Sequence, residues 1–479
     1  MKAFDRSLSG LCLIYQKLVQ FIVMTTKAEH QRKIVRLLKE FGAVKNSSRK
    51  IATNKKSTNL FRVRQQKHVS RLGLRGFNDV IAIDTKGKTA TVEGMCSYQR
   101  LVEQTLARGL MPAVVPQLKT ITLGGAISGV GIESSSFKYG LPHETVLEMQ
   151  ILTGTGEIVT ASPDNDHSDL YYGFPNSYGT LGYSLSIKIS LVAVKPFVRI
   201  TYLKFENASE YFKTLKDICD SQSWKGEKID FIDGVIFDDH SMYLVLGLMV
   251  GSAPYTSDYT NQNIFYKSLF TRSEDYLTIE DYIWRWDTDW FWCSKNIGAQ
   301  NPVVRRIIGP KRLNSAFYMK LFGLEAKYKP MALVSKVLHK PQQETIIQDV
   351  ELPIQSSEKF LKFFNESIGI VPIWICPVRQ TDSKKDWTLY RLKPGQLYVN
   401  FGFWDSAPSK PGWTEGHLNR KIEQVVAQLK GKKSLYSDSF YTKDEFDKLY
   451  NKKAYEVLKS KYDPARRYNG LYQKTVKKG

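Results

Sequence analysis

The chain has 479 residues, of which 42% are hydrophobic and 12% aromatic, so it can bury a large core and is too long for one ordinary domain. Its 69 Lys and Arg residues against 47 Asp and Glu residues give a formal charge of +22, which favours anionic partners. The basic residues are spread along the chain and no nucleic-acid-binding motif accompanies them, which argues against a nucleic-acid partner. The five cysteines show no Cys-x-x-Cys spacing, so we expect reduced thiols and no metal site.

The first 29 residues form an apolar and basic leader. Its apolar run, residues 8–24, is interrupted by Gln16, Lys17 and Gln20 and is shorter than the roughly 20 clean residues that a spanning helix needs. No small-residue cleavage site follows, so a secretory signal is not predicted either. A helix lying in the membrane interface, a plain leader and a translation start at Met24 stay open. We expect a cytoplasmic protein that associates peripherally with the inner face of the membrane.

The next section reads as an α+β domain over residues 30–198. An apolar face predicts a helix over residues 30–42, and the basic, aperiodic residues 46–73 suggest a loop or a partner-binding segment. Beyond it, periodicity and turn residues predict antiparallel pairs and two helices rather than an alternating parallel sheet. The predicted elements are a hairpin turning at 85–88, a helix over 97–109, a hairpin over 145–162, a helix near 168–174 and a strand over 183–194.

The composition then changes. Tryptophans concentrate in residues 199–435, which predicts a second α+β domain that serves as the substrate or cap domain. Residues 436–479 hold a helical stretch, which we expect to return to the first domain.

Residues 120–146 carry five glycines and three consecutive serines. Such a stretch exposes several backbone N–H groups in a small concavity, which suits a pyrophosphate. The alternative is that these glycines only allow one backbone to pack against another. A Rossmann fingerprint is disfavoured because Ser134 stands at the third glycine position and a hairpin follows, and the segment lacks the Gly-Lys-Ser/Thr ending of a P-loop.

Three separated motifs carry a resemblance. Residues 116–141, 151–159 and 174–189 resemble, in that order, the FAD-binding domain of the vanillyl-alcohol oxidase (PCMH-type) superfamily. The run GIESSSFKYGL, with residues 371–379 and 434–446, is similar to the delta-24 sterol reductase branch. The resemblance implies a two-subdomain PCMH-type FAD-binding domain, an α+β substrate (cap) domain and FAD held without a covalent bond.

The resemblance also implies which residues hold FAD. The backbone at Thr122, Gly124 and Gly125 would meet the pyrophosphate, and Ser128, Gly129 and Gly131 would leave room for the ribityl chain and isoalloxazine. The implied hydrogen-bond donors are Ser134, Ser135 and Ser136, and the implied adenine contacts are Gly179, Thr180, Leu181 and Gly182. For each serine, a turn bond to its own backbone is the alternative.

The wider family often has an early glycine-rich loop with a histidine for covalent flavin, which has no clear counterpart here. Asn59, Arg62 and Arg64 occupy roughly that place and could support the phosphates, whereas His68 and His143 are more consistent with structural roles.

Residues 281–293 pack six aromatic side chains into 13 positions. They indicate either buried core or a lipid-binding wall, and their alternation suggests a strand or lid edge with one apolar face. Asp287 and Asp289 lie among these aromatic residues, where desolvation would raise the pKa of a carboxyl and make it a candidate proton donor. A salt bridge to Arg285 or Arg272 is the alternative structural role.

The resemblance implies reduction of a carbon–carbon double bond in a lipid, with a hydride from reduced flavin N5 to one carbon and a proton to the other. Residues 114–125 and 285–293 look closer to bacterial methylene-fatty-acyl reductases, so we expect a methylene-branched or unsaturated fatty acyl or phospholipid substrate. The alternatives are a delta-24 sterol reductase, an FAD-dependent alcohol or sugar oxidase, and a non-enzymatic basic protein that binds membranes or nucleic acid. NADPH or a separate reductase would deliver the electrons, and an anionic membrane surface is an expected partner.

Overall fold

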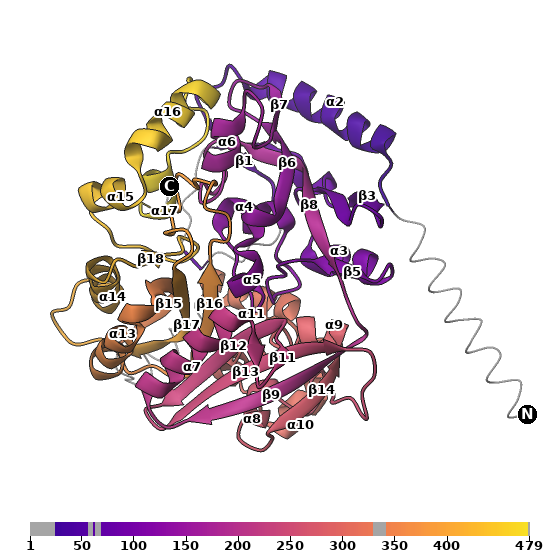
Figure 1. The fold of residues 1–479 in the computed structure, drawn as a ribbon. Helices are drawn as coiled ribbons and strands as arrows, with labels where there is room; N and C mark the ends of the chain where they lie inside the picture. The colour runs from indigo at the N-terminus through magenta and orange to yellow at the C-terminus, as the bar shows by residue number, and fades with distance from the viewer. Residues whose placement is uncertain (1–23, 56–60, 63–68, 329–341, 478–479) are drawn as a thin grey trace, which may run out of the picture.

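The computed structural model describes residues 24–55, 61–62, 69–328 and 342–477, arranged as two lobes built on separate sheets (Figure 1). The first lobe contains a six-stranded antiparallel sheet in the order β3-β4-β8-β6-β7, with β5 paired to β8. Its strands are β3 Val80–Asp84, β4 Thr89–Glu93, β5 Leu110–Pro112, β6 Val146–Leu152, β7 Ile158–Ala161 and β8 Tyr183–Ala193, and a separate parallel pair is formed by β1 Lys50–Thr53 and β2 Val69–Leu72.

Short helices surround this sheet and connect its strands. Ser97 caps α3 and Thr122 caps α4, and each side chain accepts a hydrogen bond from the backbone N–H three residues later. The helices of this lobe are α2 Lys27–Val44, η1 Leu74–Gly76, α3 Tyr98–Leu106, α4 Leu123–Gly129, α5 Ser136–Tyr139, η2 Pro142–Thr145 and α6 Ser168–Gly173.

The second lobe is an eight-stranded antiparallel sheet in the order β14-β9-β13-β12-β16-β17-β15-β18. Its strands are β9 Phe197–Phe205, β12 Phe231–Asp238, β13 Ser241–Val250, β14 Glu274–Thr278, β15 Gln343–Pro353, β16 Ile373–Arg379, β17 Leu397–Pro408 and β18 Lys432–Lys433, and β10 Ser223–Trp224 pairs with β11 Glu227–Lys228 outside it. Its helices are α7 Ala208–Ser221, α8 Phe265–Ser268, α9 Ile279–Ile283, η3 Cys293–Ile297, α10 Pro302–Ile308, α11 Ser315–Tyr328, α13 Ile354–Ser367 and α14 His417–Gln428.

The two faces of the eight-stranded sheet belong to different cores. On β16, Ile373 and Ile375 pack with α7, α13 and α14, whereas Trp374 and Cys376 belong to the core that continues into the first lobe. This period of two follows from the alternation of side chains along a strand. The sheet therefore presents one side of β16 toward the first lobe.

The C-terminal helices α15 Lys443–Leu449, α16 Lys452–Tyr462 and α17 Leu471–Thr475 lie beside the first lobe, near α6 (Figure 1). The buried Lys459 ammonium donates to the backbone oxygen of Thr180 at 2.6 Å and pairs with Asp463 at 2.7 Å. Burial lowers the pKa of Lys459 to about 8. The buried Lys459 thus attaches the C-terminal helices to the first lobe.

The predicted α+β class with antiparallel pairing is confirmed, and α2 contains the helix predicted over residues 30–42. Residues 46–73 hold the β1 and β2 pair where a loop was predicted. The strand predicted over residues 281–293 was wrong, because α9 ends at Ile283 and turns follow. The boundaries of the predicted domains stay predictions.

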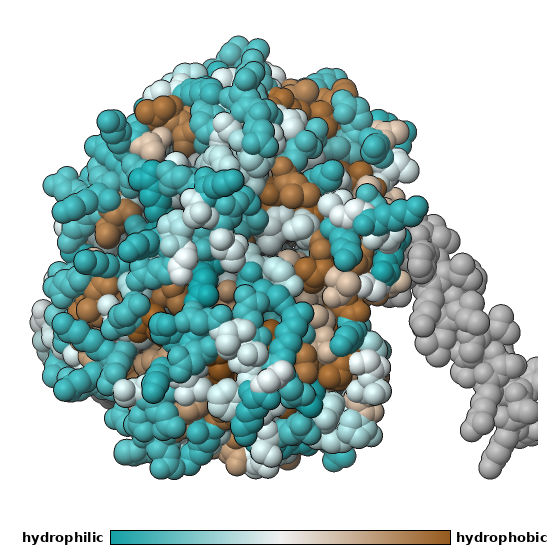
Figure 2. Space-filling model, viewed as in Figure 1, coloured by the Kyte–Doolittle hydropathy of each residue, from teal (hydrophilic) through white to brown (hydrophobic). Residues whose placement is uncertain are grey.

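The surface in Figure 2 is mostly hydrophilic, and its hydrophobic residues form small, separated patches. Among the residues that the structure covers, none of the helices combines the length and apolarity needed to cross a bilayer. Residues 1–23 of the predicted leader lie outside the described residues.

Candidate functional site

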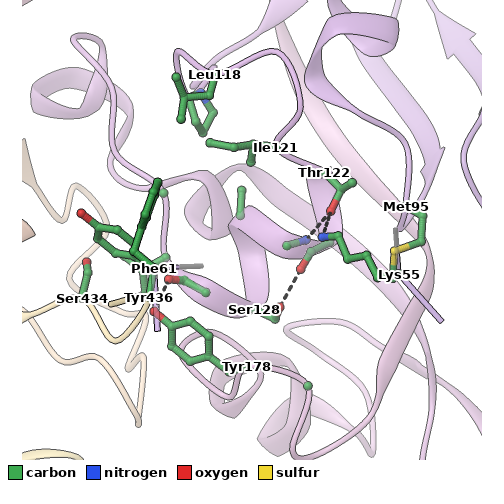
Figure 3. Close-up of a pocket in the computed structure, with 18 of the residues that line it drawn as sticks. Lys55, Phe61, Met95, Leu118, Ile121, Thr122, Ser128, Tyr178, Ser434 and Tyr436 are labelled. Atoms are coloured by element: carbon green, nitrogen blue, oxygen red, sulfur yellow. Dashed lines mark hydrogen bonds between the residues drawn. The ribbon is translucent and has the colours of Figure 1, made fainter. Parts of the chain in front are cut away.

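A cavity of about 280 Å³ lies where the two lobes meet. The first lobe contributes α4 and the loops around it, the second lobe contributes side chains of β15, β16 and β17, and the C-terminal segment contributes Lys474. Figure 3 shows Lys55 and Thr122 on one side of the cavity and Phe61, Ser434 and Tyr436 on the opposite side. The two sides differ in chemistry.

The side formed by α4 combines open backbone with positive charge. The Thr122 hydroxyl accepts hydrogen bonds from Gly125 N at 3.3 Å and from Lys55 Nζ at 3.1 Å. A Cβ atom at Gly125 would lie 2.8 Å from Thr122 Oγ1 and 3.4 Å from Lys55 Nζ, so it would fill this corner. Arg71 and Lys474 also line the cavity. Lys55 beside backbone that lacks side chains, with two further cations in the lining, suits a diphosphate.

Some of the glycines also allow backbones to pack closely. A Cβ atom at Gly124 would lie 2.6 Å from Gly94 O and 2.5 Å from Ser184 Oγ, and one at Gly182 would lie 2.7 Å from Leu152 O. Gly124, in the stretch 120–146, and Gly182, outside it, therefore both allow close backbone packing and line the cavity.

The opposite side is a wall of aromatic side chains. Phe291 stacks on Trp404 with ring centroids 4.3 Å apart, and Phe61 lies 5.2 Å from Trp290. Trp374 completes this wall and donates its indole N–H to Asp233 at 3.1 Å. Such a wall fits a flat ring or an apolar ligand.

Four non-glycine residues that line this cavity adopt positive φ. They are Val130 (62°), Tyr178 (50°), Trp290 (44°) and Phe291 (60°). This conformation is uncommon for bulky residues, and rarest for a β-branched one, and it persists only where the surrounding structure imposes it. Strained backbone of this kind is concentrated at functional sites.

The structure brings most of the predicted cofactor residues to the cavity. Those that line it are Thr122, Gly124, Gly125, Ser128, Gly129, Gly131, Gly179 and Gly182. The remaining five, which are not in its lining, are Ser134, Ser135, Ser136, Thr180 and Leu181. Their roles in binding stay predictions.

The serine hydroxyls are engaged within the protein. Ser128 donates to Gly124 O at 2.7 Å, Ser134 to Glu133 Oε1 at 2.6 Å and Ser135 to Ala113 O at 2.7 Å. Ser136 Oγ accepts from Glu133 N at 3.1 Å. The bonds of Ser128 and Ser136 are local bonds to the backbone, as in the alternative, whereas Ser134 bonds to a side chain and Ser135 to the distant backbone of Ala113.

The two carboxylates proposed as proton donors lie outside the cavity lining. Asp287 accepts from Lys119 N at 2.8 Å and from the Ser315 hydroxyl at 2.5 Å, and burial raises the pKa of its carboxyl. Asp289 pairs with Arg305 at 2.6 Å, not with the arginines that the sequence suggested. Both hold the segment that carries Trp290 in place, and their role in catalysis stays a prediction.

The sequence analysis missed a polar cluster beside the aromatic wall. Asp349 and Ser434 line the cavity, and Glu351 lies buried behind them, where Ser434 Oγ donates to it at 3.3 Å. Burial raises the pKa of Asp349 to about 6 and that of Glu351 to about 8. The Tyr390 hydroxyl donates a hydrogen bond to the buried carboxyl of Glu351. The similarity noted at residues 434–446 was the one signal near this cluster.

The basic residues considered in place of the early loop are only partly described. Arg62 is buried, donates to Leu435 O and lies 4.8 Å above the Tyr178 ring. Asn59, Arg64 and His68 lie outside the described residues. His143 packs edge-on against Trp387 at 4.5 Å, and burial lowers the pKa of its imidazole to about 3.

Comparison with known proteins points to an FAD cofactor. A family model described as "FAD binding domain" matches residues 19–162. The chain is 24% identical over 425 residues to "Delta(24)-sterol reductase homolog dhcr-24" of Caenorhabditis elegans, covering 84% of this chain and 78% of that protein. It is 24% identical over 413 residues to "Delta(24)-sterol reductase" of Homo sapiens, covering 83% and 76%.

A third relative matches over a shorter part of the chain. "Cytokinin dehydrogenase 3" of Arabidopsis thaliana is 34% identical over 152 residues, covering 31% of this chain and 28% of that protein. The cations and open backbone on one side of the cavity, with aromatic rings on the other, fit FAD. Among the described residues, no group of three or more His, Cys, Asp or Glu is placed to hold a metal ion.

We predict that Gly125→Val abolishes FAD retention. The added side chain would occupy the corner between Thr122 and Lys55, where the diphosphate has its closest access to the backbone. The measurement is flavin absorbance per mole of purified protein. Gly251→Val is the matched control, since a Cβ atom there meets nothing within 4 Å. Full FAD occupancy in Gly125→Val would remove this corner from the cofactor site.

We predict a pH-dependent stability that depends on Glu351. Because burial raises its pKa from 4.5 to about 8, the folded protein holds a proton that the unfolded chain has released between these pH values. The free energy of unfolding should therefore fall as pH rises through this range, by up to about 1.4 kcal/mol per pH unit from this group. Denaturant unfolding of Glu351→Gln should show a shallower fall, and the exposed Glu358→Gln should match the unmodified protein.

Proposed function

Because this chain is an FAD-dependent oxidoreductase with an FAD-binding domain of the vanillyl-alcohol oxidase type, we propose that it reduces the delta(24) double bond of a sterol. The observation that carries the proposal is the extent of the similarity to the sterol reductases. It covers 83–84% of the chain and so includes the second lobe, which contributes most of the aromatic wall. A match to the FAD-binding domain alone would support the cofactor and not the substrate.

The sequence analysis favoured an acyl chain over a sterol, and the comparisons support the sterol alternative better. Both substrates are apolar, and an aromatic wall accepts either, so the residues of the cavity do not separate them. The relatives that match over both lobes are named as sterol reductases. The cytokinin dehydrogenase match covers only 31% of this chain and supports no substrate for it.

Reduced FAD, when bound, supplies the hydride that double-bond reduction requires. Lys55, Arg71 and Lys474 would neutralise the negative charge of its diphosphate. The aromatic wall would exclude water from the apolar substrate and orient it by contact with ring faces. Electrons would come from NADPH or from a separate reductase.

We also propose that the protein meets its lipid substrate at an anionic membrane surface. On the short helix α10, the apolar side chains of Val303 and Ile307 have 67% and 76% of their surface exposed. Arg306, Lys311 and Arg312 are exposed beside them, and the whole chain carries a formal charge of +22. Exposed apolar residues ringed by cations favour a surface of acidic lipids.

We predict that the photoreduced enzyme is reoxidised anaerobically by a delta(24)-unsaturated sterol. The flavin absorbance should return, and mass spectrometry should find product with two added hydrogens. A phospholipid with a methylene-branched chain and one with an unsaturated chain serve as comparison substrates. Faster reoxidation by a phospholipid than by the sterol would replace the sterol with an acyl chain, and reoxidation by oxygen alone would favour the oxidase alternative.

We predict that binding to vesicles depends on α10. The full chain should sediment with vesicles rich in phosphatidylserine more than with phosphatidylcholine vesicles, and less so as salt rises, because salt screens the charges. Val303→Asp with Ile307→Asp should weaken this binding several-fold, whereas the matched pair Val35→Asp and Val457→Asp, also exposed, should not. Equal binding by both double variants would show that α10 does not dock.

A further inference from the structure

A carboxyl and a phenol meet at the aromatic side of the cavity. Asp349 on β15 and Tyr436, which follows β18, both line it. Asp349 is the one carboxylate in the part of the lining that the structure describes. In Figure 3, Tyr436 lies beside Phe61 and Ser434, opposite the glycine and lysine side where the phosphates would lie.

These two side chains belong to a directed hydrogen-bond network. The Trp404 indole N–H donates to the Tyr436 oxygen at 2.8 Å, and Asn400 Nδ2 donates to Asp349 Oδ1 at 2.8 Å. Tyr436 and Asp349 are hydrogen-bonded to each other. Trp404 belongs to the aromatic wall, so the network fixes the phenol at the place where an apolar substrate would rest.

The protonation of this pair is set by its surroundings. Burial raises the pKa of Asp349 to about 6, and hydrogen bonds from Asn400 and Tyr436 lower it from a still higher value. Burial and the Asp349 charge raise the pKa of Tyr436, so the phenol keeps its proton. Both groups therefore hold a proton under mildly acidic conditions.

We propose that Tyr436 donates the proton that double-bond reduction consumes and that Asp349 replaces it. This inference rests on the proposed function. Tyr436 would be the catalytic acid because it faces the substrate space, and Asp349 would act through it.

One alkene carbon gains a hydride, which brings the electron pair, and the other carbon gains the Tyr436 proton as the π bond breaks. The phenolate recovers a proton from Asp349 through their hydrogen bond, and the Asp349 carboxylate recovers one from water. The substrate gains two hydrogens and the cofactor loses two electrons, so no further oxidant or reductant is needed.

Other titratable groups lie near Asp349 and Tyr436 and contribute to the pH dependence of this pair. Glu351 lies close enough for its charge and that of Asp349 to affect each other, and Tyr178 is affected by Asp349 and by Arg62. Of these, Glu351 has a pKa raised to about 8 and stays protonated through the range in which Asp349 titrates. Asp349 is thus the group expected to change charge first as pH rises above 5.

The first test reads protonation directly, without turnover. Infrared difference spectra of the FAD-loaded protein between pH 4 and 9 should contain a carboxylic-acid C=O band that is lost with a midpoint near 6 and that is absent from Asp349→Asn. Tyr436→Phe should move this midpoint upward, because it removes a hydrogen bond that lowers the pKa of Asp349. Tyr398→Phe, on β17 and outside the described lining of the cavity, is the control and should leave it in place. An unmoved midpoint in Tyr436→Phe would overturn the relay.

The second test measures the reaction itself. Photoreduced enzyme mixed with the delta(24) sterol should be reoxidised at least about 100-fold more slowly in Tyr436→Phe and Asp349→Asn, at unchanged FAD occupancy, since a positioned acid contributes on the order of 10²–10⁴. The rate of the unmodified enzyme should fall as pH rises past about 6. A Tyr436→Phe rate within twofold of the unmodified enzyme would overturn the proposal. An unmodified enzyme inert toward the sterol would refute the proposed function, and the infrared midpoints would then still decide whether the pair shares a proton.

Discussion

Asp233 lies fully buried on β12 and ties the two lobes together. Its Oδ2 atom accepts from Arg285 at 2.7 Å, from the Trp286 indole at 2.9 Å and from the Trp374 indole at 3.1 Å. Arg285 in turn lies 3.7 Å from Glu133, in the glycine and serine stretch of the first lobe. Removing one member of a buried charged network leaves the others desolvated and unpaired, which costs about 3–5 kcal/mol. The position of the aromatic wall relative to α4 depends on this cluster.

The same cluster explains why the serine-rich run contributes less to the cavity than its composition suggested. Burial raises the pKa of Glu133 to about 7, and Ser134 and Ser136 bond to this residue. Ile232 N donates to Ser134 O at 2.8 Å, so the run is fastened to β12 of the other lobe. Sequence indicated correctly that this segment has unusual backbone demands. It did not indicate that one half of the segment lines the cavity and the other half packs against the second lobe.

Features of the fold that depend on neighbours in sequence could be predicted, and features that depend on distant neighbours could not. The hairpin of β6 and β7 follows from apolar alternation around a Thr-Gly turn, and α2 from its apolar face. The segment from Trp284 to Trp292 alternates like a strand, yet hydrogen bonds to Asp233, Asp287 and Asp289 hold it in turns. Nothing within the segment encodes the partners of those carboxylates.

The candidate site also has one part that the sequence predicts, the glycine side, and one that it does not, the aromatic side. The two parts differ in charge. FAD carries negative charge, so glycines and cations are the residues expected to meet it, and the glycines leave a local signature in the sequence. The aromatic side holds a single described carboxyl, Asp349, which Asn400, Tyr436 and aromatic rings surround, and burial there raises its pKa to about 6. Asp349 and Tyr436 stand 87 positions apart in the chain and meet only because β18 pairs with β15. The order of the strands brings these two residues together, and neither periodicity nor a local motif predicts that they meet.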